Sequence, residues 1–502
     1  MEKKEILKFC VENGFFLDKG MLDFFLGLGD KEFMDIIKRL KGLGINEKIL
    51  TETVFEKYKG RIDCFLSSFE KVDSEVKILE DIKINSGKIE ARDFVSYFRS
   101  RFEVLRDILM KNGKLENLSS IRRIGMKNGV FCVIGMVYSK RVTKNKNLLI
   151  EIEDLTGRSV ILVNKENKEL FERAQGLLLD DIVAFNVSGS VKMLFVSDFV
   201  YPGAGLKKEV FGNKSDVVAF ISDLHIGSKM FLEGNLMKFI NWLNGNVGDK
   251  RQRDLAGKVR YLVVGGDNID GVGVYPGQER FLKIKGCKRQ YEKLAEILGK
   301  IRKSVEIVMC PGQHDAVWVG EPQPAILEKW GGSLSKLDNL RLVSNPSVFE
   351  IGGLKILVYH GGNLNKFIDE SEYIRINYGH RCPTKVIKEI LKRRHLAPIY
   401  GEMDIVPNKE MDDLVLKGLP DVFVIGGQHR AMIENYNNIL IVSTSCWQSK
   451  TDFEDKIGSE PEFCRVPILN LKSKEIKILD FSENEIKWES GSDLVCELGG
   501  GK

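Results

Sequence analysis

Most histidines of this chain stand where strands are predicted to end. Four of the six follow short apolar runs, and aspartates stand near them. These four are His225, His314, His360 and His429. Imidazole and carboxylate groups together suit manganese, iron or zinc better than calcium. A single histidine after a strand is usually structural, but that explanation does not account for four of six, so we predict a metal site.

The aspartates and histidines lie in five turns that contain glycine. The turns are DLHIG at 223–227, GGDNIDG at 265–271, PGQHDAV at 311–317, YHGG at 359–362 and GGQH at 426–429. Each follows an apolar segment, namely 217–222, 259–264, 305–310, 354–359 and 421–425. In open α/β sheets, ligands bind beyond the carboxyl ends of the strands. We therefore expect the five turns to converge on one site.

Spacing within the turns assigns individual roles. Asp223 and His225 are two residues apart at a strand end, so their side chains point to the same side and can bind one ion. A pair of metal ions about 3.5–4 Å apart needs a shared carboxylate, and we expect Asp267 to be that bridge. Asp270, three residues later, is expected to brace the turn.

The segments around these turns define the domains that must position them. Residues 215–490 alternate predicted strands and helices, which is typical of a large α/β domain. Residues 113–205 contain five predicted strands with a helix between the third and fourth, the order of an OB-fold β-barrel. Residues 1–59 have apolar residues at helical spacing and predict a small helical bundle that docks to a protein. Residues 60–112 are charge-rich and are expected to be a partly helical linker.

The predicted barrel has a basic loop between its first two strands. The loop carries Lys140, Arg141, Lys144 and Lys146, and OB folds bind single-stranded nucleic acids through positively charged grooves. We therefore expect these four residues to contact DNA. Aromatic residues that could stack on bases are few in the barrel, so docking to a protein is an equally good interpretation of this domain.

Composition excludes several classes of protein. The 502 residues include 76 basic and 71 acidic side chains, and the net charge of +5 favours local basic patches over a histone-like field. No apolar run is long enough for a membrane helix, and the first residues do not resemble a secretory signal. The nine cysteines form no CxxC pair and are expected to be free thiols. The expected location is the cytoplasm, without membrane contact.

The ordered set of five turns resembles the calcineurin-like metallophosphoesterase family. Three further segments are similar to the small-subunit family of archaeal family-D DNA polymerases (DNA polymerase II). They are EPQPA at 321–325, KRRHLAPIYG at 392–401 and CWQ at 446–448. The resemblance covers essentially the full chain. It implies a multidomain protein with a small helical N-terminal domain, an OB-fold β-barrel and a calcineurin-like α/β domain built as a two-sheet sandwich.

The same resemblance implies an activity and its partners. It implies a 3′→5′ exonuclease that removes nucleotides from single-stranded 3′ ends of DNA and so proofreads for a DNA-directed DNA polymerase. The polymerase active site would lie on a separate large subunit, with which this chain would form a heterodimer. Two divalent metal ions are implied, with manganese preferred and magnesium, iron or zinc as alternatives.

The family pattern also implies the roles of individual residues. The first metal ion would be held by Asp223, His225, Asp267 and His429. The second would be held by Asp267, Gln313, His360 and the residue at 427. His314 would protonate the leaving 3′ oxygen, and Asp315 would orient the ring of His314.

Two positions depart from the family pattern, and both belong to the second metal ion. Gln313 stands where the family usually has asparagine, and Gly427 stands where it usually has histidine. Gln313 keeps an amide oxygen, whereas Gly427 offers no side chain, so the second site is expected to be weakened. Three functions stay open: an active exonuclease subunit, a structural polymerase subunit with a decayed nuclease, and a free-standing metallophosphatase, which the barrel disfavours.

Overall fold

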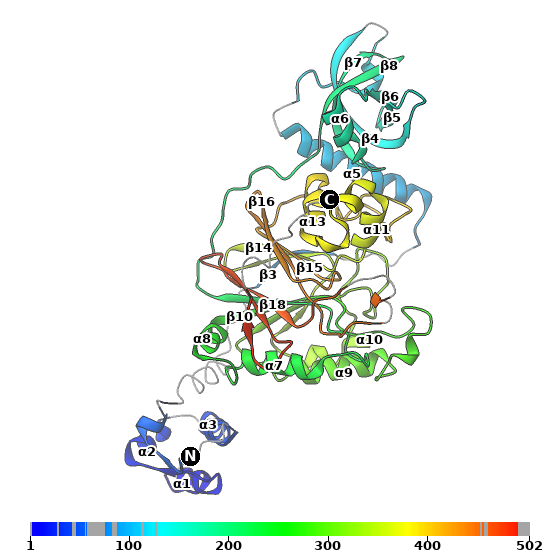
Figure 1. Cartoon of the computed structure of the whole chain (residues 1–502). Helices are drawn as coiled ribbons and strands as arrows, with labels where there is room; N and C mark the ends of the chain where they lie inside the picture. Colours follow the sequence, from blue (N-terminus) through cyan, green and yellow to red (C-terminus); the bar gives the residue numbers. More distant parts are fainter. Residues whose placement is uncertain are drawn as a thin grey trace.

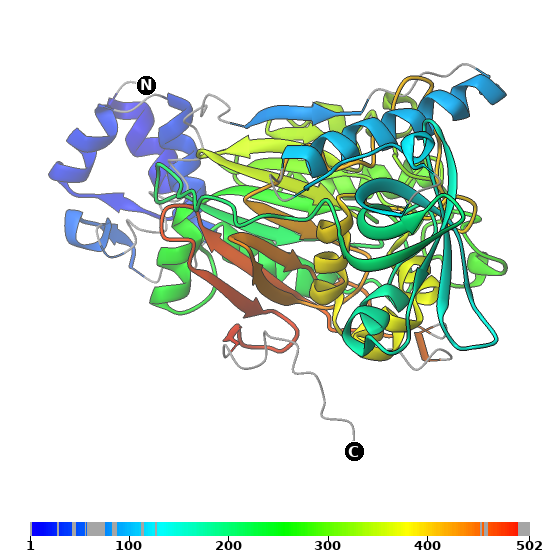
Figure 2. The ribbon, with the colours of Figure 1, turned by 90° about the horizontal axis from the view of Figure 1, so that it is seen from above.

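The computed structural model shows three parts that follow one another along a long axis (Figure 1). It describes residues 3–27, 30–42, 47–55, 57, 76–82, 88–111, 115–125, 128–451, 454–455 and 460–489. N-terminal helices lie at one end, a large α/β body lies in the middle, and a β-barrel lies at the other end. Seen from above, the N-terminal helices and the barrel lie toward opposite sides of the body (Figure 2).

Three helices form most of the N-terminal unit: α1 (Lys3–Glu12), α2 (Lys19–Leu26) and α3 (Asp30–Gly42). They surround a core rich in phenylalanine, in which the rings of Phe25 and Phe33 meet edge to face at 5.2 Å. The short strands β1 (Phe16–Leu17) and β2 (Ile49–Leu50) pair in parallel. The predicted helical character of this unit is confirmed for the described residues, with one small strand pair added.

The barrel contains β4 (Gly129–Val142), β5 (Leu148–Asp154), β6 (Gly157–Val163), α6 (Lys168–Gln175), β7 (Ile182–Ser190) and β8 (Met193–Val200). Its strands close in the order β4-β5-β6-β8-β7. The long strand β4 pairs with β7 along Gly129–Met136 and with β5 from Met136 onward, so it belongs to both halves of the barrel. Phe185 and Phe199 fill the interior. The predicted five-stranded OB-like barrel is confirmed, including the helix after the third strand.

Two sheets form the α/β body. The seven-stranded sheet has the order β12 (Leu340–Leu342), β11 (Glu306–Cys310), β10 (Val259–Gly265), β9 (Val217–Ile221), β18 (Arg465–Asn470), β19 (Ile476–Asp480) and β20 (Lys487–Trp488). The six-stranded sheet has the order β16 (Met432–Tyr436), β17 (Ile439–Ser443), β15 (Val422–Ile425), β14 (Leu354–Tyr359), β13 (Ser347–Ile351) and β3 (Lys77–Asp81). Their inner faces share one apolar core that includes Phe220 of one sheet and Ile356 of the other. The predicted two-sheet sandwich is confirmed.

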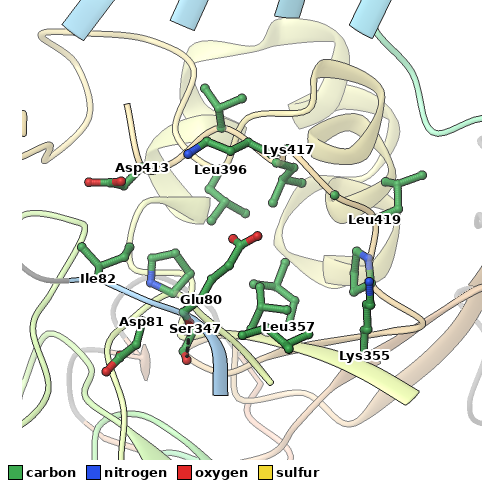
Figure 3. Close-up of a pocket in the computed structure, with 17 residues that line it drawn as sticks. Glu80, Asp81, Ile82, Ser347, Lys355, Leu357, Leu396, Asp413, Lys417 and Leu419 are labelled. Atoms are coloured by element: carbon green, nitrogen blue, oxygen red, sulfur yellow. Dashed lines mark hydrogen bonds between the residues drawn. The ribbon is translucent and has the colours of Figure 1, made fainter. Parts of the chain in front are cut away.

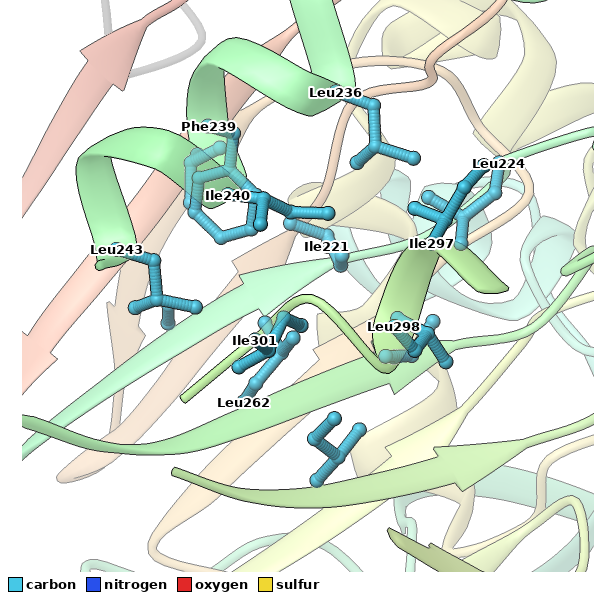
Figure 4. Close-up of a cluster of buried hydrophobic side chains, with 14 of the residues drawn as sticks. Ile221, Leu224, Leu236, Phe239, Ile240, Leu243, Leu262, Ile297, Leu298 and Ile301 are labelled. Atoms are coloured by element: carbon cyan, nitrogen blue, oxygen red, sulfur yellow. The ribbon is translucent and has the colours of Figure 1, made fainter. Parts of the chain in front are cut away.

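Helices cover both outer faces of the sandwich. They are α7 (Glu233–Leu243), α8 (Lys250–Lys258), α9 (Cys287–Leu298) and α10 (Glu328–Gly331) on the seven-stranded sheet, and α11 (Leu364–Glu370), α12 (Glu372–Asn377) and α13 (Pro383–Arg393) on the six-stranded sheet. Phe239 and Ile240 of α7 pack with Ile221 of β9 and Leu262 of β10 (Figure 4). Short 3-10 helices occur at Ile121–Arg123, Gln278–Arg280, Leu334–Lys336 and Gly379–Arg381.

Part of the range expected to be a linker belongs to the folded body. β3 pairs antiparallel with β13 at the edge of the six-stranded sheet. Helix α5 (Ala91–Lys111) packs against barrel strand β7. Most side chains of β3 are exposed, so this edge strand lacks the apolar alternation by which a strand is predicted from sequence.

A buried arginine fixes α5 to the body. Arg101 is 1% exposed, and its Nε donates to Asp412 Oδ2 at 2.6 Å while Nη1 donates to the carbonyl of Pro398 at 2.7 Å. His395 Nε2 lies 2.8 Å from the same oxygen of Asp412. The segment 392–401, which carries part of the family resemblance, therefore has a structural role in this joint.

A second buried arginine joins the barrel to the body. Arg393, at the end of α13, lies with Nε 3.0 Å from Asp181 Oδ1, and its Nη2 donates to the carbonyl of Gly176 at 2.6 Å. Asp181 and Gly176 both belong to the barrel. Because the pair is buried and has further hydrogen bonds, it fixes the orientation of the two domains instead of merely tethering them.

Most of the described cysteines have the expected state. Six are free thiols: Cys10, Cys132, Cys287, Cys310, Cys446 and Cys464. Cys382 is in a disulfide, so the expectation of free thiols is wrong at this position, where spacing alone gives no sign of pairing. Within the described ranges, we find no helix with the length and apolar character that crossing a bilayer requires.

Arg101→Met should lower the free energy of unfolding by about 3–5 kcal/mol, because Asp412 would keep a buried charge without its guanidinium partner. Adding Asp412→Leu should recover part of that loss. Denaturant midpoints, together with hydrogen exchange of the α5 amides, measure both effects. Arg99→Met, an exposed arginine on the same helix, is the control. Equal losses in the single and double variants would show that packing, and not charge, causes the effect.

Candidate metal centre

All five predicted turns meet at one edge of the sandwich. β9, β10 and β11 run parallel in one sheet, and β14 and β15 run parallel in the other, so both sheets direct carboxyl ends to this edge. Three overlapping clusters result: Asp223 with His225 and His429; His225 with Asp267 and His314; and Asp223 with Asp267 and His360. Donor atoms within each cluster lie within 4.8 Å of one another. The predicted convergence of the turns is thus observed.

The turns hold four of these residues in an unusual backbone conformation. Asp223, His225, Asp267 and His429 have φ values of 52°, 48°, 49° and 53°. The left-handed region costs a non-glycine residue on the order of 1–3 kcal/mol, and such strain concentrates at functional sites. These four are the residues implied for the first metal ion.

The first cluster contains two buried atoms with unmet bonding capacity. Asp223 Oδ1 lies 3.4 Å from His429 Nε2 but accepts no hydrogen bond from the described residues. His225 Nε2 is also buried and has no hydrogen-bond partner there. Buried polar atoms are nearly always satisfied. An oxygen and an imidazole nitrogen left over side by side are what a bound cation requires.

Carboxylates outside the clusters orient the histidine rings. Asp270 Oδ1 lies 3.2 Å from His225 Nδ1, and Glu454 Oε1 lies 2.7 Å from His429 Nδ1. Each contact uses the Nδ1 atom and leaves Nε2 for the cluster, an arrangement common around metal-binding histidines. Asp270 therefore braces the ring of His225 as well as the turn. Glu454 was not found from the sequence, because no motif surrounds it.

The third cluster joins both aspartates to His360. His360 Nε2 lies 3.3 Å from Asp267 Oδ2, and His360 Nδ1 lies 2.9 Å from the carbonyl of Gly265, which fixes the ring. Asp267 Oδ1 accepts a hydrogen bond from the amide of His314 at 2.8 Å. Asp267 and Asp223 each belong to two of the three clusters, so both carboxylates lie where two clusters overlap.

Taken together, the side chains of the clusters fit a divalent cation. They supply carboxylate oxygen and imidazole nitrogen, a mixture that manganese, iron and zinc accept. Buried ligand atoms without hydrogen-bond partners among the described residues, and histidine rings fixed by hydrogen bonds, are already in place. The clusters are therefore consistent with metal binding without a change of fold.

The ring of His314 is oriented by a main-chain carbonyl and not, as the family pattern implied, by Asp315. Its Nδ1 lies 2.9 Å from the main-chain carbonyl of Asp270, so Asp315 is not the residue that orients the ring. Asp315 instead accepts hydrogen bonds from the amide of Gly312 and the hydroxyl of Tyr291, each at 2.9 Å. It stabilises the third turn through these hydrogen bonds. His314 is 22% exposed, whereas the side chains of His225 and His360 are nearly inaccessible.

The two departures from the family pattern have structural correlates. A Cβ atom added to Gly362, two residues after His360, would lie 2.6 Å from Gln313 Cδ, so the glutamine side chain packs against that turn. Gly427 has φ 67°, and its amide donates to Asp223 Oδ2 at 2.9 Å. A Cβ there would lie 3.0 Å from the carbonyl oxygen of His360 and 3.3 Å from its Nε2. A side chain at 427 would thus need His360 to shift by a few tenths of an ångström, at a backbone φ that side chains rarely adopt.

The buried carboxylates dominate the electrostatics of the centre. Burial, the largest single influence, lowers the pKa of His360, but the charge and hydrogen bond of Asp267 together with the charge of Asp223 outweigh burial and raise that pKa to about 10. Burial raises the pKa of Asp267, whereas the His360 and His314 rings hold it well below its usual range. The field around Asp223 and Asp267 therefore favours positive charge, which protons or metal ions can supply.

The four basic residues predicted to contact DNA are not equivalent. Lys140 Nζ donates to the carbonyls of Gln175 and Leu177, at 2.9 and 2.6 Å, and so holds the end of α6 on the barrel. Arg141, Lys144 and Lys146 are exposed around the β4–β5 hairpin tip. Lys140 therefore has a structural contact of its own, while the other three present charge to solvent.

A cavity of about 460 Å³ lies outside the metal centre (Figure 3). Glu80 and Ile82 from the β3 segment, Leu357 of β14, and Leu396 and Lys417 from the chain after α13 are among its lining residues. None of its lining residues belongs to the three clusters.

The fold and the site together define the class of protein. A two-sheet α/β sandwich that gathers buried aspartates and histidines stands beside an OB-like barrel. The family model for the B subunits of DNA polymerases alpha and epsilon matches residues 218–434. The chain belongs to the family of archaeal family-D DNA polymerase small subunits, known as DNA polymerase II small subunits.

Relatives of this family cover most of the chain. The DNA polymerase II small subunit of Methanothermobacter thermautotrophicus is 35% identical over 458 residues, which is 89% of this chain and 93% of that protein. The subunit of Archaeoglobus fulgidus is 34% identical over 478 residues, 91% of this chain and 93% of that protein. The subunit of Pyrococcus furiosus is 35% identical over 79% of this chain but only 65% of its own length.

Solved structures share the sandwich only distantly. Vps29 of Entamoeba histolytica covers 54% of this chain and 97% of its own, with 12% identity and a TM-score of 0.27. A predicted phosphoesterase of Streptococcus pneumoniae covers 55% of this chain and 97% of its own, with 11% identity and a TM-score of 0.24. Likeness at this level carries no argument about function.

Glu454→Gln should lower the affinity of the first site for manganese by about 10–100-fold, because the carboxylate that orients His429 would lose its charge. Calorimetric titration of the metal-free chain with Mn²⁺ measures the change. Asp455→Asn changes a neighbouring carboxylate that is largely exposed and paired with Lys450, and it serves as the control. Unchanged affinity in the Glu454 variant would remove His429 from the metal ligands.

Proposed function

We propose that this chain is the small subunit of a heterodimeric DNA polymerase and that its metal centre is a 3′→5′ exonuclease. The observation that carries the proposal is the set of overlapping clusters, in which Asp223 Oδ1 and His225 Nε2 are buried without hydrogen-bond partners among the described residues. Most buried polar side-chain atoms in proteins have a partner, and here two without one among the described residues occur in the same cluster. Family membership directs the chemistry to DNA.

The roles of the residues follow from their positions. Asp223, His225 and His429 would hold one divalent ion, and Asp267 would be shared with a second ion at His360. When bound, such a pair neutralises a phosphodiester and lowers the pKa of an attacking water. His314, fixed through Nδ1 and partly exposed, keeps Nε2 for the substrate and would donate a proton to the leaving 3′ oxygen.

The partner is a large subunit that carries the polymerase active site. Support comes from the names of the relatives, each of which is called a small subunit. The substrate would be the single-stranded 3′ end of DNA, and the complex would act in the cytoplasm. The N-terminal helical unit, expected at residues 1–59, remains our proposed protein-docking element.

A structural subunit with a decayed nuclease is the second candidate. It is favoured by one observation: Gly427 has no side chain, and the ring of His360 occupies the space beside it. In that case the side chains left to hold the second ion would be those of Asp267, His360 and Gln313. A free-standing metallophosphatase, in contrast, has no support from the family.

Asp267→Asn should reduce 3′ nucleotide removal about 100-fold or more, because the shared carboxylate would lose its charge. The assay follows a 5′-labelled single strand in Mn²⁺, with the chain alone and with the large subunit, and EDTA should abolish the activity. Asp338→Asn, at an exposed position, is the control.

Two other results would overturn the exonuclease. If the unaltered chain and the Asp267→Asn variant removed 3′ nucleotides at the same background rate, with and without Mn²⁺, the chain would be a structural subunit. Hydrolysis of p-nitrophenyl phosphate without any cutting of DNA would establish the phosphatase.

Changing Arg141, Lys144 and Lys146 together to glutamine should weaken binding of single-stranded DNA and lower the salt slope by about 1 for each phosphate left without its basic partner. Fluorescence anisotropy between low and moderate salt measures both quantities. Lys140→Gln should instead lower the melting temperature, because Lys140 Nζ donates to two carbonyls within the barrel. An unchanged salt slope in the triple variant would leave protein docking as the role of the barrel.

A further inference from the structure

An exposed loop with apolar and aromatic side chains borders the metal centre. Val272, Val274 and Tyr275 follow the second turn and are 48%, 38% and 40% exposed. The ring of Tyr275 lies 6.4 Å from the ring of His314, centroid to centroid, at an angle of 61°. Apolar side chains this exposed, beside a buried polar centre, suggest a surface that contacts a ligand.

The loop is held rigidly in that position. Gln278 is fully buried; its Nε2 donates to the carbonyl of Asp270 at 2.6 Å, and its Oε1 accepts from the amide of Val274 at 2.9 Å. Gln290 accepts from the amide of Gly271 and donates to its carbonyl, at 2.9 and 3.0 Å. Two buried glutamines therefore fix an otherwise exposed loop, and Gln278 ties it to the same Asp270 that orients His225.

A basic strip continues from the loop along the side of the centre. Between 279 and 289, one exposed acidic side chain is accompanied by five exposed basic ones: Arg280, Lys283, Lys285, Lys288 and Arg289. The strip lies directly against the first turn, because the amides of Lys283 and Ile284 donate to the carbonyl of Gly227 at 2.7 and 3.1 Å. Its charge complements a phosphate backbone.

A second aromatic side chain follows the third turn. Trp318, four residues after His314, is 39% exposed. Its indole nitrogen donates to the carbonyl of Pro322 at 2.8 Å, which fixes the ring while part of it faces solvent. Aromatic rings thus follow both the second and the third turns of the centre.

We propose that Tyr275, with Trp318, stacks on the terminal bases of a single DNA strand while the basic strip at 280–289 binds its phosphates. This inference rests on the proposed exonuclease and names how its substrate is positioned. Stacking accepts any base, as a proofreading site must, and unpaired bases present their faces whereas paired bases do not. A strand held in this way would bring its last phosphodiester to His314. The barrel, which has few exposed aromatics, would not be needed for this step.

The test measures binding without catalysis. Anisotropy of a labelled oligothymidylate is measured with the full chain in EDTA and low salt, so the result is readable even if the chain never cuts DNA. Tyr275→Ser should weaken binding about tenfold or more, and Tyr275→Phe should leave it nearly unchanged. An abasic oligonucleotide should bind to the unaltered chain and to Tyr275→Ser alike. Trp488→Ser, an exposed aromatic on edge strand β20, is the control.

A variant of the basic strip tests phosphate binding separately from base stacking. Lys285→Gln should weaken binding of the abasic and the normal strand equally and should lower the salt slope by about 1. In an active preparation, Tyr275→Ser should raise KM more than it lowers kcat. Equal binding by Tyr275→Ser and the unaltered chain, an equal loss on the abasic strand, or no measurable binding by the unaltered chain would overturn the proposal. Failure of cutting alone would overturn only the exonuclease.

Discussion

Two carboxylates that share one buried pocket, Asp223 and Asp267, impose the constraint on which the rest of this structure depends. They occur in a single cluster and are almost inaccessible to solvent. Two adjacent anions in such a place cannot both stay ionised without compensating positive charge. The chain surrounds them with imidazoles and holds each ring by its Nδ1 atom. The pocket therefore favours positive charge, which protonated imidazoles or metal ions can supply.

Two of the three clusters need both sheets. Asp223 and Asp267 follow strands of the seven-stranded sheet, while His360 and His429 follow strands of the six-stranded sheet, so the clusters that contain these histidines exist only when the two sheets pack. The approach is so close that glycine is required at the contact. A Cβ on Gly312, after β11, would lie 2.8 Å from His360 Nε2, after β14 of the other sheet. The core between the sheets thus determines the geometry of the site as well as the stability of the domain.

Structural features that are set by short runs of residues could be predicted from the sequence. Buried strands that end in Asp- and His-bearing turns are visible as local patterns, and so are the five strands of the barrel. Features that depend on distant contacts were missed or misassigned. Glu454 contacts His429, 25 residues away in the sequence, and no motif marks it. Asp315 stabilises its own turn and does not orient the ring of His314. β3 went unseen because its partner lies far along the chain and most of its own side chains face solvent.

The place of β3 changes how the chain is divided. This strand precedes the barrel, yet it completes a sheet whose other strands all follow the barrel, so the barrel is an insertion within the α/β domain. Ile82, at the end of β3, donates to Ser344, 262 residues later. During synthesis the strand must wait for most of the protein before it can pair, a non-local step of the kind that slows folding. A fragment beginning at residue 215 would expose the edge of β13, and open edges of sheets recruit other chains.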